Sequence, residues 1–233
     1  MSAQCSPFPA SLAAPPSRYD NPFATCWTRP GALDFRFAEG DSADQLIARL
    51  ATNGWRGAIV GPHGSGKSTL LHTLNPALRA AGCRVRTVSL RDKQGYLPRG
   101  SFAFDVVGDA CDTTRPLPSK YHRTLLIVDG YEQLGWLERW RLEWHCRRAN
   151  LGLLVTSHAP TRIPTLIHLE PDARLLQQLV AELTTDLSTQ VVPRHVTASH
   201  ACHGSNVREI LFDLYDLHER LRLRGRTRDP DRA

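Results

Sequence analysis

The sequence predicts an α/β protein built on a parallel sheet, and two observations support this prediction. First, five short runs of apolar, often β-branched residues recur along the chain, with helical patterns between several of them. Most of these runs are nearly continuous in hydrophobicity, like strands buried on both faces of a parallel sheet. Second, the pattern changes after residue 171 to helices alone. We therefore expect a three-layer sheet core followed by a small C-terminal helical lid.

The expected elements alternate along the core. Strands are predicted at 56–60, 84–90, 124–128, 151–156 and 165–169, core helices at 42–52, 67–80 and 134–148, and lid helices at 172–187, 191–202 and 206–223. The last core helix repeats tryptophan every four residues, at Trp136, Trp140 and Trp144. We interpret this stripe as the face that packs on the sheet, in preference to an aromatic platform for stacking.

Composition divides the chain into four stretches: a flexible leader at 1–20, a core at 21–171, the lid at 172–224 and a basic tail at 225–233. Of its 233 residues, 41% are hydrophobic and 22% charged, as in an ordinary globular protein. No apolar run approaches the ~20 residues that span a bilayer, and no secretory signal is visible. Six scattered cysteines without a C-x-x-C pair indicate reduced thiols. We therefore expect a cytoplasmic protein without membrane contact.

The formal net charge is +6, and part of the excess lies near the C-terminus. The arginines there are Arg220, Arg222, Arg224, Arg226, Arg228 and Arg232. One interpretation of such a tail is contact with nucleic acid or an acidic partner. The alternative is a solvated helix end, where arginines suit the negative end of the helix dipole. The sequence leaves both interpretations open.

The segment from Gly61 to Ser68 matches the phosphate-binding pattern G-x-x-x-x-G-K-S/T, with a predicted strand before it and a predicted helix after it. Glycines let the backbone curl so that several N–H groups point at phosphate oxygens, and the helix N-terminus adds positive potential. Lys67 is expected to reach the β- and γ-phosphates, and the Ser68 hydroxyl to ligate Mg²⁺. The predicted nucleotide-binding residues are Gly61, Pro62, His63, Gly64, Ser65, Gly66, Lys67, Ser68 and Thr69.

A second motif ends the apolar strand predicted at 124–128, where Asp129 follows directly. A carboxylate in this place, paired with the upstream loop, predicts a second Mg²⁺ ligand opposite Ser68. Glu132 is the first acid after Asp129, and we interpret it as the carboxylate that activates the attacking water. The alternative is that Glu132 only caps the helix that follows.

Two further segments bring polar residues toward the expected phosphate site. The strand at 151–156 ends in Thr156 and Ser157, followed by His158. We favour Thr156, with Ser157 second, as the group that contacts the γ-phosphate or the attacking water; simple capping of the strand end is the alternative. Arg208 lies in the first turn of the last predicted helix, from which it is expected to pair with phosphate.

These four motifs together resemble the P-loop ATPases of the additional-strand (ASCE) class, in particular the AAA+ and STAND branches. The resemblance covers roughly residues 21–223 and implies a sheet of order 5-1-4-3-2 with a helical lid. Thr156 to His158 is similar to the T-S-R strand end of STAND proteins, with His158 in place of Arg. The segment 204–209 is similar to the G-N-V-R-E motif of AAA+ lids with Ser205 inserted, so that Arg208 matches the sensor arginine.

The same resemblance implies further roles. Asn21 to Phe23 and the turns near Pro30 are expected to border the adenine, and Arg162 is the candidate arginine finger toward a neighbouring subunit of a homo-oligomer. The chain departs from both branches, because it lacks the long sensor or repeat domains of STAND proteins, an evident winged helix and an evident pore-loop motif.

The function expected from the sequence is Mg²⁺-dependent ATP binding and hydrolysis, coupling lid motion to an unknown protein partner. One alternative is a nucleotide-gated interaction module with little turnover. Another is a small-molecule kinase, for which Arg147, Arg148 and Arg162 are available. Glu132 separates these functions, because a true base predicts steady turnover and a capping residue predicts slow turnover.

Overall fold

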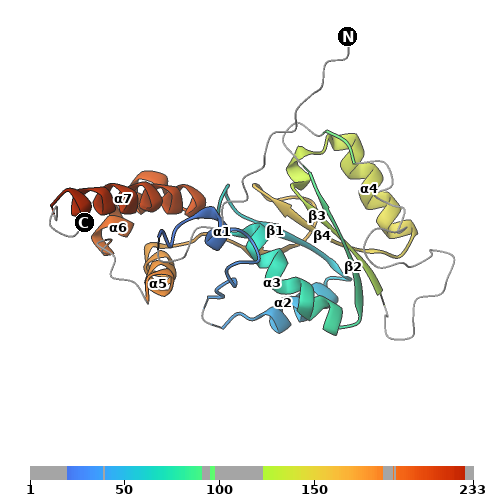
Figure 1. Cartoon of the computed structure of the whole chain (residues 1–233). Helices are drawn as coiled ribbons and strands as arrows, with labels where there is room; N and C mark the ends of the chain where they lie inside the picture. The colour runs from blue at the N-terminus through green and yellow to red at the C-terminus, as the bar shows by residue number, and fades with distance from the viewer. Residues whose placement is uncertain are drawn as a thin grey trace, which may run out of the picture.

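A computed structural model of the chain describes residues 20–38, 40–90, 95–97, 123–185, 191 and 193–228, with side chains up to 224. The leader predicted at 1–20 lies outside the described residues except for Asp20. Within the described residues, five strands form a single parallel sheet (Figure 1). The strands are β1 Arg56–Val60, β2 Cys83–Ser89, β3 Arg123–Asp129, β4 Gly152–Ser157 and β5 Thr165–His168.

The strand order is β2-β3-β4-β1-β5, and every neighbouring pair is parallel. This order is the expected 5-1-4-3-2 arrangement, so the predicted fold class is confirmed. β1 lies between β4 and β5, with Val60 opposite Ser157. β3 pairs with β4 on the other side, with Val128 opposite Val155. The carboxyl ends of β1, β3 and β4 therefore meet at one edge of the sheet, where the predicted motifs begin.

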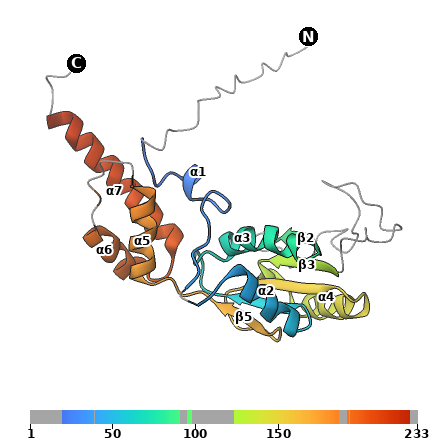
Figure 2. The same cartoon turned by 90° about the horizontal axis from the view of Figure 1, so that it is seen from below.

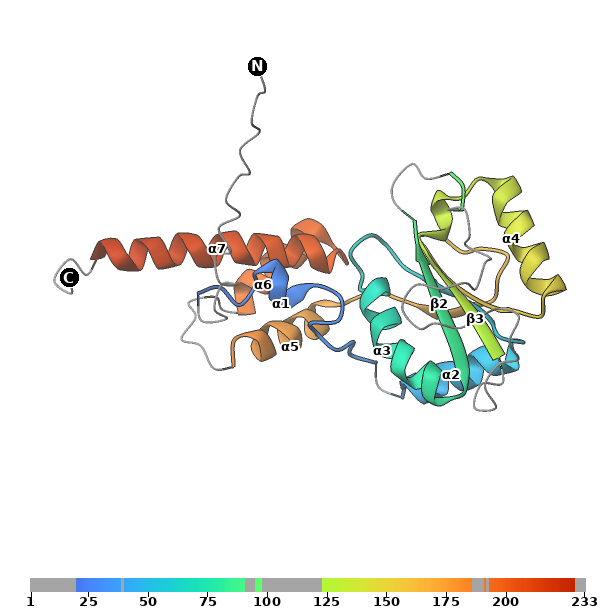
Figure 3. The ribbon, with the colours of Figure 1, turned by 45° about the vertical axis from the view of Figure 1, so that its right-hand side comes forward.

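Helices cover both faces of the sheet, which gives the predicted three layers (Figure 3). The helices α2 (Ala43–Thr52) and α3 (Lys67–Ala80) enclose one core with the sheet, centred on Leu50, Leu74 and Ile127. The helix α4 (Trp136–Arg148) covers the opposite face, where Leu142 and Cys146 pack on strand residues. Burial of these apolar side chains is the main stabilising contribution of each layer.

The predicted role of the tryptophan stripe on α4 is wrong. Trp136, Trp140 and Trp144 are 81%, 59% and 51% exposed and lie on the outer face of the helix. The inner face contains the buried Leu142 and Cys146. It also contains polar side chains that find partners: Glu143 accepts a hydrogen bond from Tyr131 Oη at 2.9 Å. Because these polar groups are paired, α4 buries this face without the indoles.

The three C-terminal helices form a separate layer beside the sheet domain (Figure 2). They are α5 (Ala173–Leu183), α6 (Pro193–His203) and α7 (Val207–Arg228), and we call them the helical lid. Asp172 caps α5 by accepting a hydrogen bond from Leu175 N at 2.7 Å. The lid has its own apolar core, and Phe23 from the N-terminal segment is fully buried within it.

The helix α7 extends beyond the predicted lid boundary, so the expected basic tail begins inside a helix that runs to Arg228. Among the described residues, no helix is both long and apolar enough to cross a membrane. In the part of the chain that the structure describes, Cys26, Cys83, Cys146 and Cys202 are all free thiols.

Candidate functional site

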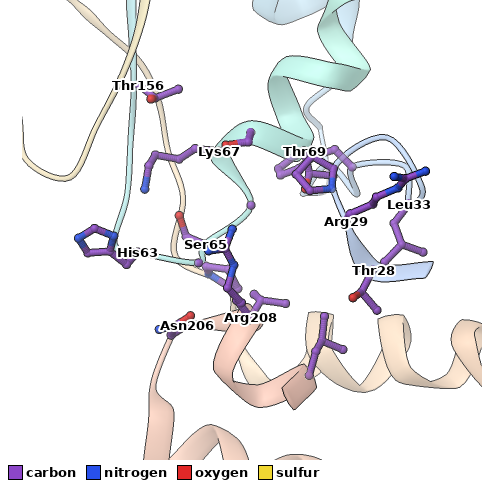
Figure 4. Close-up of a pocket in the computed structure, with 18 of the residues that line it drawn as sticks. Thr28, Arg29, Leu33, His63, Ser65, Lys67, Thr69, Thr156, Asn206 and Arg208 are labelled. Carbon is purple, nitrogen blue, oxygen red and sulfur yellow. The ribbon is translucent and has the colours of Figure 1, made fainter. Parts of the chain in front are cut away.

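The predicted phosphate loop connects β1 to α3 at the carboxyl edge of the sheet (Figure 4). Gly66 caps α3 with φ +94°, a backbone conformation that is open to glycine at little cost. Gly64 also has a positive φ, +70°. The two left-handed residues curl the loop so that the N-terminus of the 14-residue α3 faces the cavity beyond it.

Lys67 folds back over the loop instead of extending into solvent. Its Nζ donates to the carbonyl oxygens of Gly61 at 2.7 Å and Pro62 at 2.6 Å. Burial lowers the pKa of this ammonium, while the nearby carboxylates of Glu132 and Asp129 act in the opposite direction. The loop therefore presents a partly desolvated cation beside the expected position of the phosphates.

Asp129 lies between two hydroxyl groups. Ser68 Oγ donates to Asp129 Oδ2 at 3.0 Å, and Thr156 Oγ1 donates to Asp129 Oδ1 at 2.6 Å. Thr156 is fully buried, and its hydroxyl also accepts a hydrogen bond from Gly130 N at 2.8 Å. The Thr156 hydroxyl thus positions Asp129, and Thr156 also lines the cavity, so its expected contact with phosphate or water stays a prediction. Ser157, the second choice, accepts from Ala159 N at 3.3 Å.

Glu132 lies in a short 3₁₀ turn, η1 (Tyr131–Gln133), between β3 and α4. Arg139 of α4 fixes this turn, because its guanidinium donates to the carbonyl oxygens of Glu132 and Leu134, both at 2.8 Å. The Arg139 guanidinium also lies over the Tyr131 ring, 5.1 Å from its centroid. The carboxylate of Glu132 is thus supported from α4, a connection that the sequence did not predict.

The side chain of Glu132 points toward His158. Glu132 Oε1 lies 2.6 Å from His158 Nε2, while Glu132 Oε2 is buried without a hydrogen-bond partner. His158 Nδ1 lies 3.4 Å from Lys67 Nζ, and its ring stacks on His63 of the phosphate loop at 3.5 Å between centroids. The residues Lys67, His63, His158 and Glu132 therefore form one contiguous cluster.

Burial is the main cause that lowers the pKa of His158, with Lys67 and His63 adding to it and Glu132 opposing it. A neutral ring with its proton on Nε2 satisfies both contacts, since it donates to Glu132 and offers Nδ1 to Lys67. His158 stands where the T-S-R strand end of the resembling proteins has an arginine. In this chain it contacts the candidate catalytic carboxylate of Glu132.

The lid reaches the phosphate loop at the start of α7. Asn206 caps this helix by accepting a hydrogen bond from Glu209 N at 3.3 Å. A Cβ built on Gly64 would lie only 1.9 Å from Asn206 Oδ1 and 3.3 Å from Arg208 Cβ. Arg208 lines the cavity beside the loop, as Figure 4 shows. This close approach places the predicted sensor arginine next to the expected phosphate position.

A cavity of about 860 Å³ opens between the phosphate loop and the lid. Away from the phosphate loop, the N-terminal segment and the lid line this cavity with both apolar and polar groups. The apolar residues include Pro30, Leu33, Leu175, Leu179 and Leu211, and the polar residues include Thr25, Thr28, Arg29, Asp34 and Arg36. Of the residues expected near adenine, the turns near Pro30 line this cavity, whereas Asn21 to Phe23 do not. Asn21 instead donates to Tyr215 O and Glu219 Oε1, and Phe23 is buried in the lid core.

The remaining predicted residues have defined places. The loop from His63 to Thr69 lines the cavity, whereas Gly61 and Pro62 contribute through their carbonyl contacts to Lys67. Arg162 is exposed on the turn between β4 and β5 and does not line the cavity. Its expected role toward a second copy of the chain stays a prediction.

The donor set fits a magnesium nucleotide. Ser68 and Asp129 supply a hydroxyl and a carboxylate oxygen on neighbouring elements, the hard ligands that Mg²⁺ prefers. Within the described ranges there is no cluster of three or more His, Cys, Asp or Glu residues able to hold a metal. A Mg²⁺ bound with a nucleotide takes one or two protein ligands and completes its shell with phosphate and water. Ser65 Oγ, buried without a partner, adds an unsatisfied polar atom to the loop.

Comparisons with known proteins find no matching family model and no matching curated protein. The solved structures similar to this chain include the ADP complex of S. cerevisiae Hsp104, with 15% identity and a TM-score of 0.48. They also include the replication initiator DnaA bound to AMPPCP and single-stranded DNA, with 17% identity and a TM-score of 0.49. A third is a RuvB mutant from Thermotoga maritima, with 14% identity and a TM-score of 0.43. The matches cover 83%, 83% and 80% of this chain.

This chain spans 32% of the Hsp104 chain, 67% of the DnaA chain and 61% of the RuvB chain. These solved structures are AAA+ ATPases, the branch that the sequence motifs resemble. At these identities the likeness concerns the fold.

Proposed function

We propose that this chain binds Mg-ATP in the cavity between the phosphate loop and the lid, and hydrolyses it. The observation that supports this proposal most directly is the Ser68–Asp129–Thr156 chain of hydrogen bonds beside Lys67. It brings the hydroxyl of the phosphate loop and the carboxylate at the end of β3 to 3.0 Å, the arrangement needed for two ligands of one cation.

The phosphate end of the site uses the positive groups of the loop. Backbone N–H groups at the start of α3 and the Lys67 ammonium bind the β- and γ-phosphates, and Arg208 approaches from the lid. Lys67 leaves its carbonyl partners on Gly61 and Pro62 when it pairs with phosphate. A bound Mg²⁺ would lie at Ser68 and Asp129, where it would neutralise charge that develops on the phosphate oxygens.

Glu132 supplies the base. A water oxygen forms a bond to the γ-phosphorus, the bond between the γ-phosphorus and the bridging oxygen breaks, and Glu132 accepts a proton of the water. The unpaired Glu132 Oε2 is the oxygen available for this proton, because Oε1 is already bonded to His158. His158 orients the carboxylate and does not touch the reacting atoms.

The output of the reaction is motion of the lid. Asn206 and Arg208 contact or approach the phosphate loop, so nucleotide state and the position of α7 are linked through these residues. An unknown protein partner would read this motion, and Arg162 would complete the site of a neighbouring copy if the chain assembles.

A nucleotide-gated module with little turnover is the second candidate, and the Glu132–His158 pair favours it in one respect. A carboxylate held at 2.6 Å by a histidine is restrained from water. If the pair persists with nucleotide bound, the chain binds Mg-ATP tightly and hydrolyses it slowly.

The decisive experiment measures binding and phosphate release for Mg-ATP and Mg-GTP with the full chain. Wild type is compared with Lys67→Ala and Glu132→Gln, and with Glu170→Gln as a control for an exposed carboxylate outside the site. We expect Lys67→Ala to abolish binding. We expect Glu132→Gln to retain binding and to lose turnover by 10²-fold or more, on the order expected for general base catalysis.

Three other results would change this conclusion. Tight binding without turnover in wild type, with no change in Glu132→Gln, would replace the ATPase by the nucleotide-gated module. Phosphate transfer that depends wholly on a second substrate would indicate a kinase. Failure of both Mg-ATP and Mg-GTP to bind wild type would refute the site itself.

A further inference from the structure

The outer face of α4 is aromatic and cationic and takes no part in the proposed nucleotide site. Every exposed residue of this helix is a tryptophan, a leucine or an arginine. They are Trp136, Leu137, Trp140, Arg141, Trp144, Arg147 and Arg148, and we call them the α4 outer face. Large exposed indoles of this kind are unusual on a soluble surface and commonly mark a binding site.

Charge on this face is of one sign. The two carboxylates of α4 are less exposed than its arginines, at 25% for Glu138 and 17% for Glu143 against 65% for Arg141 and 70% for Arg147. Glu138 pairs with Arg141 at 3.0 Å, and Glu143 pairs with Arg147 at 3.8 Å. Glu143 accepts from Tyr131 Oη and pairs with Arg56 beneath the helix. The exposed charges of the α4 outer face are therefore three arginines, which the two partly buried glutamates compensate only in part, and this excess favours an anionic ligand.

The rings and the guanidinium groups are interleaved along one line. Trp140 and Trp144 lie 6.5 Å apart between centroids with planes 18° apart, and the Arg148 guanidinium lies 5.4 Å from the Trp144 centroid. Tryptophans four residues apart rise by about 6 Å along the helix. The Gly135 N–Gly95 O hydrogen bond of 3.3 Å holds the 95–97 segment, which includes the 65% exposed Tyr96, at the start of α4.

We propose that the α4 outer face binds single-stranded nucleic acid, with bases stacked on the indoles and phosphates paired with the arginines. A repeat of about 6 Å suits an extended strand better than a duplex, whose bases follow every 3.4 Å. Each base of the strand offers a π-face, and each phosphate between bases carries a negative charge. The tryptophans and arginines of the α4 outer face alternate in the same way. Arginine binds phosphate oxygens through two N–H groups and stacks on aromatic rings at the same time.

The mixing of tryptophans and arginines on one face favours single-stranded nucleic acid over a membrane surface and over an apolar protein partner. On a helix that lies in a membrane surface, the cations and the apolar side chains occupy opposite faces. Here Arg148 stands over Trp144 on the same face. An apolar protein partner would have to remove three guanidinium groups from water, those of Arg141, Arg147 and Arg148, against only the two carboxylates that pair with the first two. That excess of buried positive charge is unfavourable.

The test measures fluorescence anisotropy of a labelled 20-nucleotide oligothymidine with the full chain, between 50 and 200 mM salt. Trp140→Ala is expected to raise Kd about fivefold or more, from the loss of one stacked base, and Trp140→Phe to retain most of the binding. Arg141→Ala is expected to lower the slope of log K against log salt by about 0.7, the value for one phosphate contact of a single strand. Leu223→Ala, at an exposed residue of α7, serves as the control and leaves Kd unchanged.

Four outcomes would overturn the proposal. They are absence of binding, an unchanged Kd in Trp140→Ala, weakening by Arg220→Ala in the basic C-terminal helix but not by Arg141→Ala, and tryptophan-dependent binding to phosphatidylglycerol vesicles or to a second copy instead of the oligonucleotide. The substituted residues are exposed, so equal melting temperatures and equal Mg-ATP affinities confirm that each variant is folded. Because Trp140 is exposed and does not line the nucleotide cavity, failure here leaves the ATPase proposal untouched.

Discussion

Replacing Thr156 by valine tests the network that orders the candidate Mg²⁺ site. Thr156 lies fully buried at the end of β4, where its hydroxyl accepts from Gly130 N at 2.8 Å and donates to Asp129 Oδ1 at 2.6 Å. Valine has nearly the same shape but neither donates nor accepts. Thr156→Val therefore removes both hydrogen bonds without opening a cavity, and its effect reports on polar contacts alone.

The magnitude follows from the two groups that lose a hydrogen bond, Gly130 N–H and the Asp129 carboxylate. An unsatisfied N–H at Gly130 costs about 1–3 kcal/mol. The carboxylate of Asp129 keeps the Ser68 contact at 3.0 Å and is partly exposed, so water replaces much of what it loses. We expect Thr156→Val to lower the free energy of unfolding by about 2–4 kcal/mol in total. Thr156→Ser keeps the hydroxyl and removes one buried methyl group, for about 1 kcal/mol.

Urea denaturation followed by circular dichroism measures this difference, with equal m-values as the check that the unfolding transition is unchanged. Mg²⁺ titration of nucleotide binding is the second readout, because a mobile Asp129 binds the cation more weakly. If Thr156→Val is no more destabilising than Thr156→Ser, or if the Mg²⁺ dependence of both variants equals that of wild type, the hydroxyl does not position Asp129.

Three other substitutions test the loop, the histidine and the supporting arginine. Gly64→Ala should destabilise the chain by about 1 kcal/mol more than Gly54→Ala, because both put alanine at positive φ but only Gly64→Ala displaces the Asn206 cap. Since burial lowers the pKa of His158, the unfolded chain takes up its proton first; the free energy of unfolding should fall as pH drops below about 6.5, and His158→Gln should remove part of that slope. Arg139→Leu should lower kcat about tenfold with unchanged nucleotide affinity, because the Glu132 turn loses two charged hydrogen bonds.

Each of these predictions has a clear counter-result. Equal melting temperatures for the two glycine variants, or an effect of Gly64→Ala that persists in full in an Asn206→Ala background, would exclude the clash with the cap. A pH slope between 5 and 7 that is the same in His158→Gln and wild type would place the titration elsewhere, for instance at His218, whose pKa burial also lowers. A change in nucleotide affinity equal to the change in kcat would show that Arg139 supports the whole site rather than the turn.

The elements of the core were predictable because each depends on a local pattern. All five strands and the six longer helices of the described chain lie within a few residues of their predicted positions. A buried parallel strand is recognised by its own run of apolar residues, and α3 by the glycine loop that begins it. The strand order of the sheet was predicted from the family resemblance of the motifs, because hydrophobic runs alone do not indicate which strands are neighbours.

The tryptophan stripe was misread because a period of four residues identifies a helical face but not its direction. Trp136, Trp140 and Trp144 form a more hydrophobic stripe than the face that is buried, which includes Arg139 and Glu143. That polar face can be buried only because Arg139 reaches backbone carbonyls and Glu143 reaches Tyr131. These partners are brought in by the tertiary structure, and the sequence of residues 136–148 alone does not predict them.

The contacts within the candidate site could not be predicted for the same reason, because they join segments that are distant in the sequence. Thr156 and Asp129 end two neighbouring strands, so their approach follows from the β3–β4 pairing, which the sequence alone does not state. The contact between Glu132 and His158 joins two loops of different strands. Its only signal in the sequence was the histidine that replaces the arginine of the resembling motif.

The two faces of α4 connect the proposed strand-binding surface to the proposed base. On the inner face, Arg139 donates to the turn of Glu132 and Glu143 accepts from Tyr131, so a shift of the helix moves that turn with it. On the outer face, Arg148 and Trp144 lie on the same helix as these contacts. Binding that favours one position of α4 therefore changes the placement of the carboxylate, and with it the rate of turnover. Any change that the strand makes in nucleotide affinity must be matched by an equal change that the nucleotide makes in strand affinity. We expect oligothymidine to change ATP turnover in wild type but not in Arg139→Leu. Unchanged turnover in wild type would show that α4 is docked too rigidly on β4 to transmit the shift.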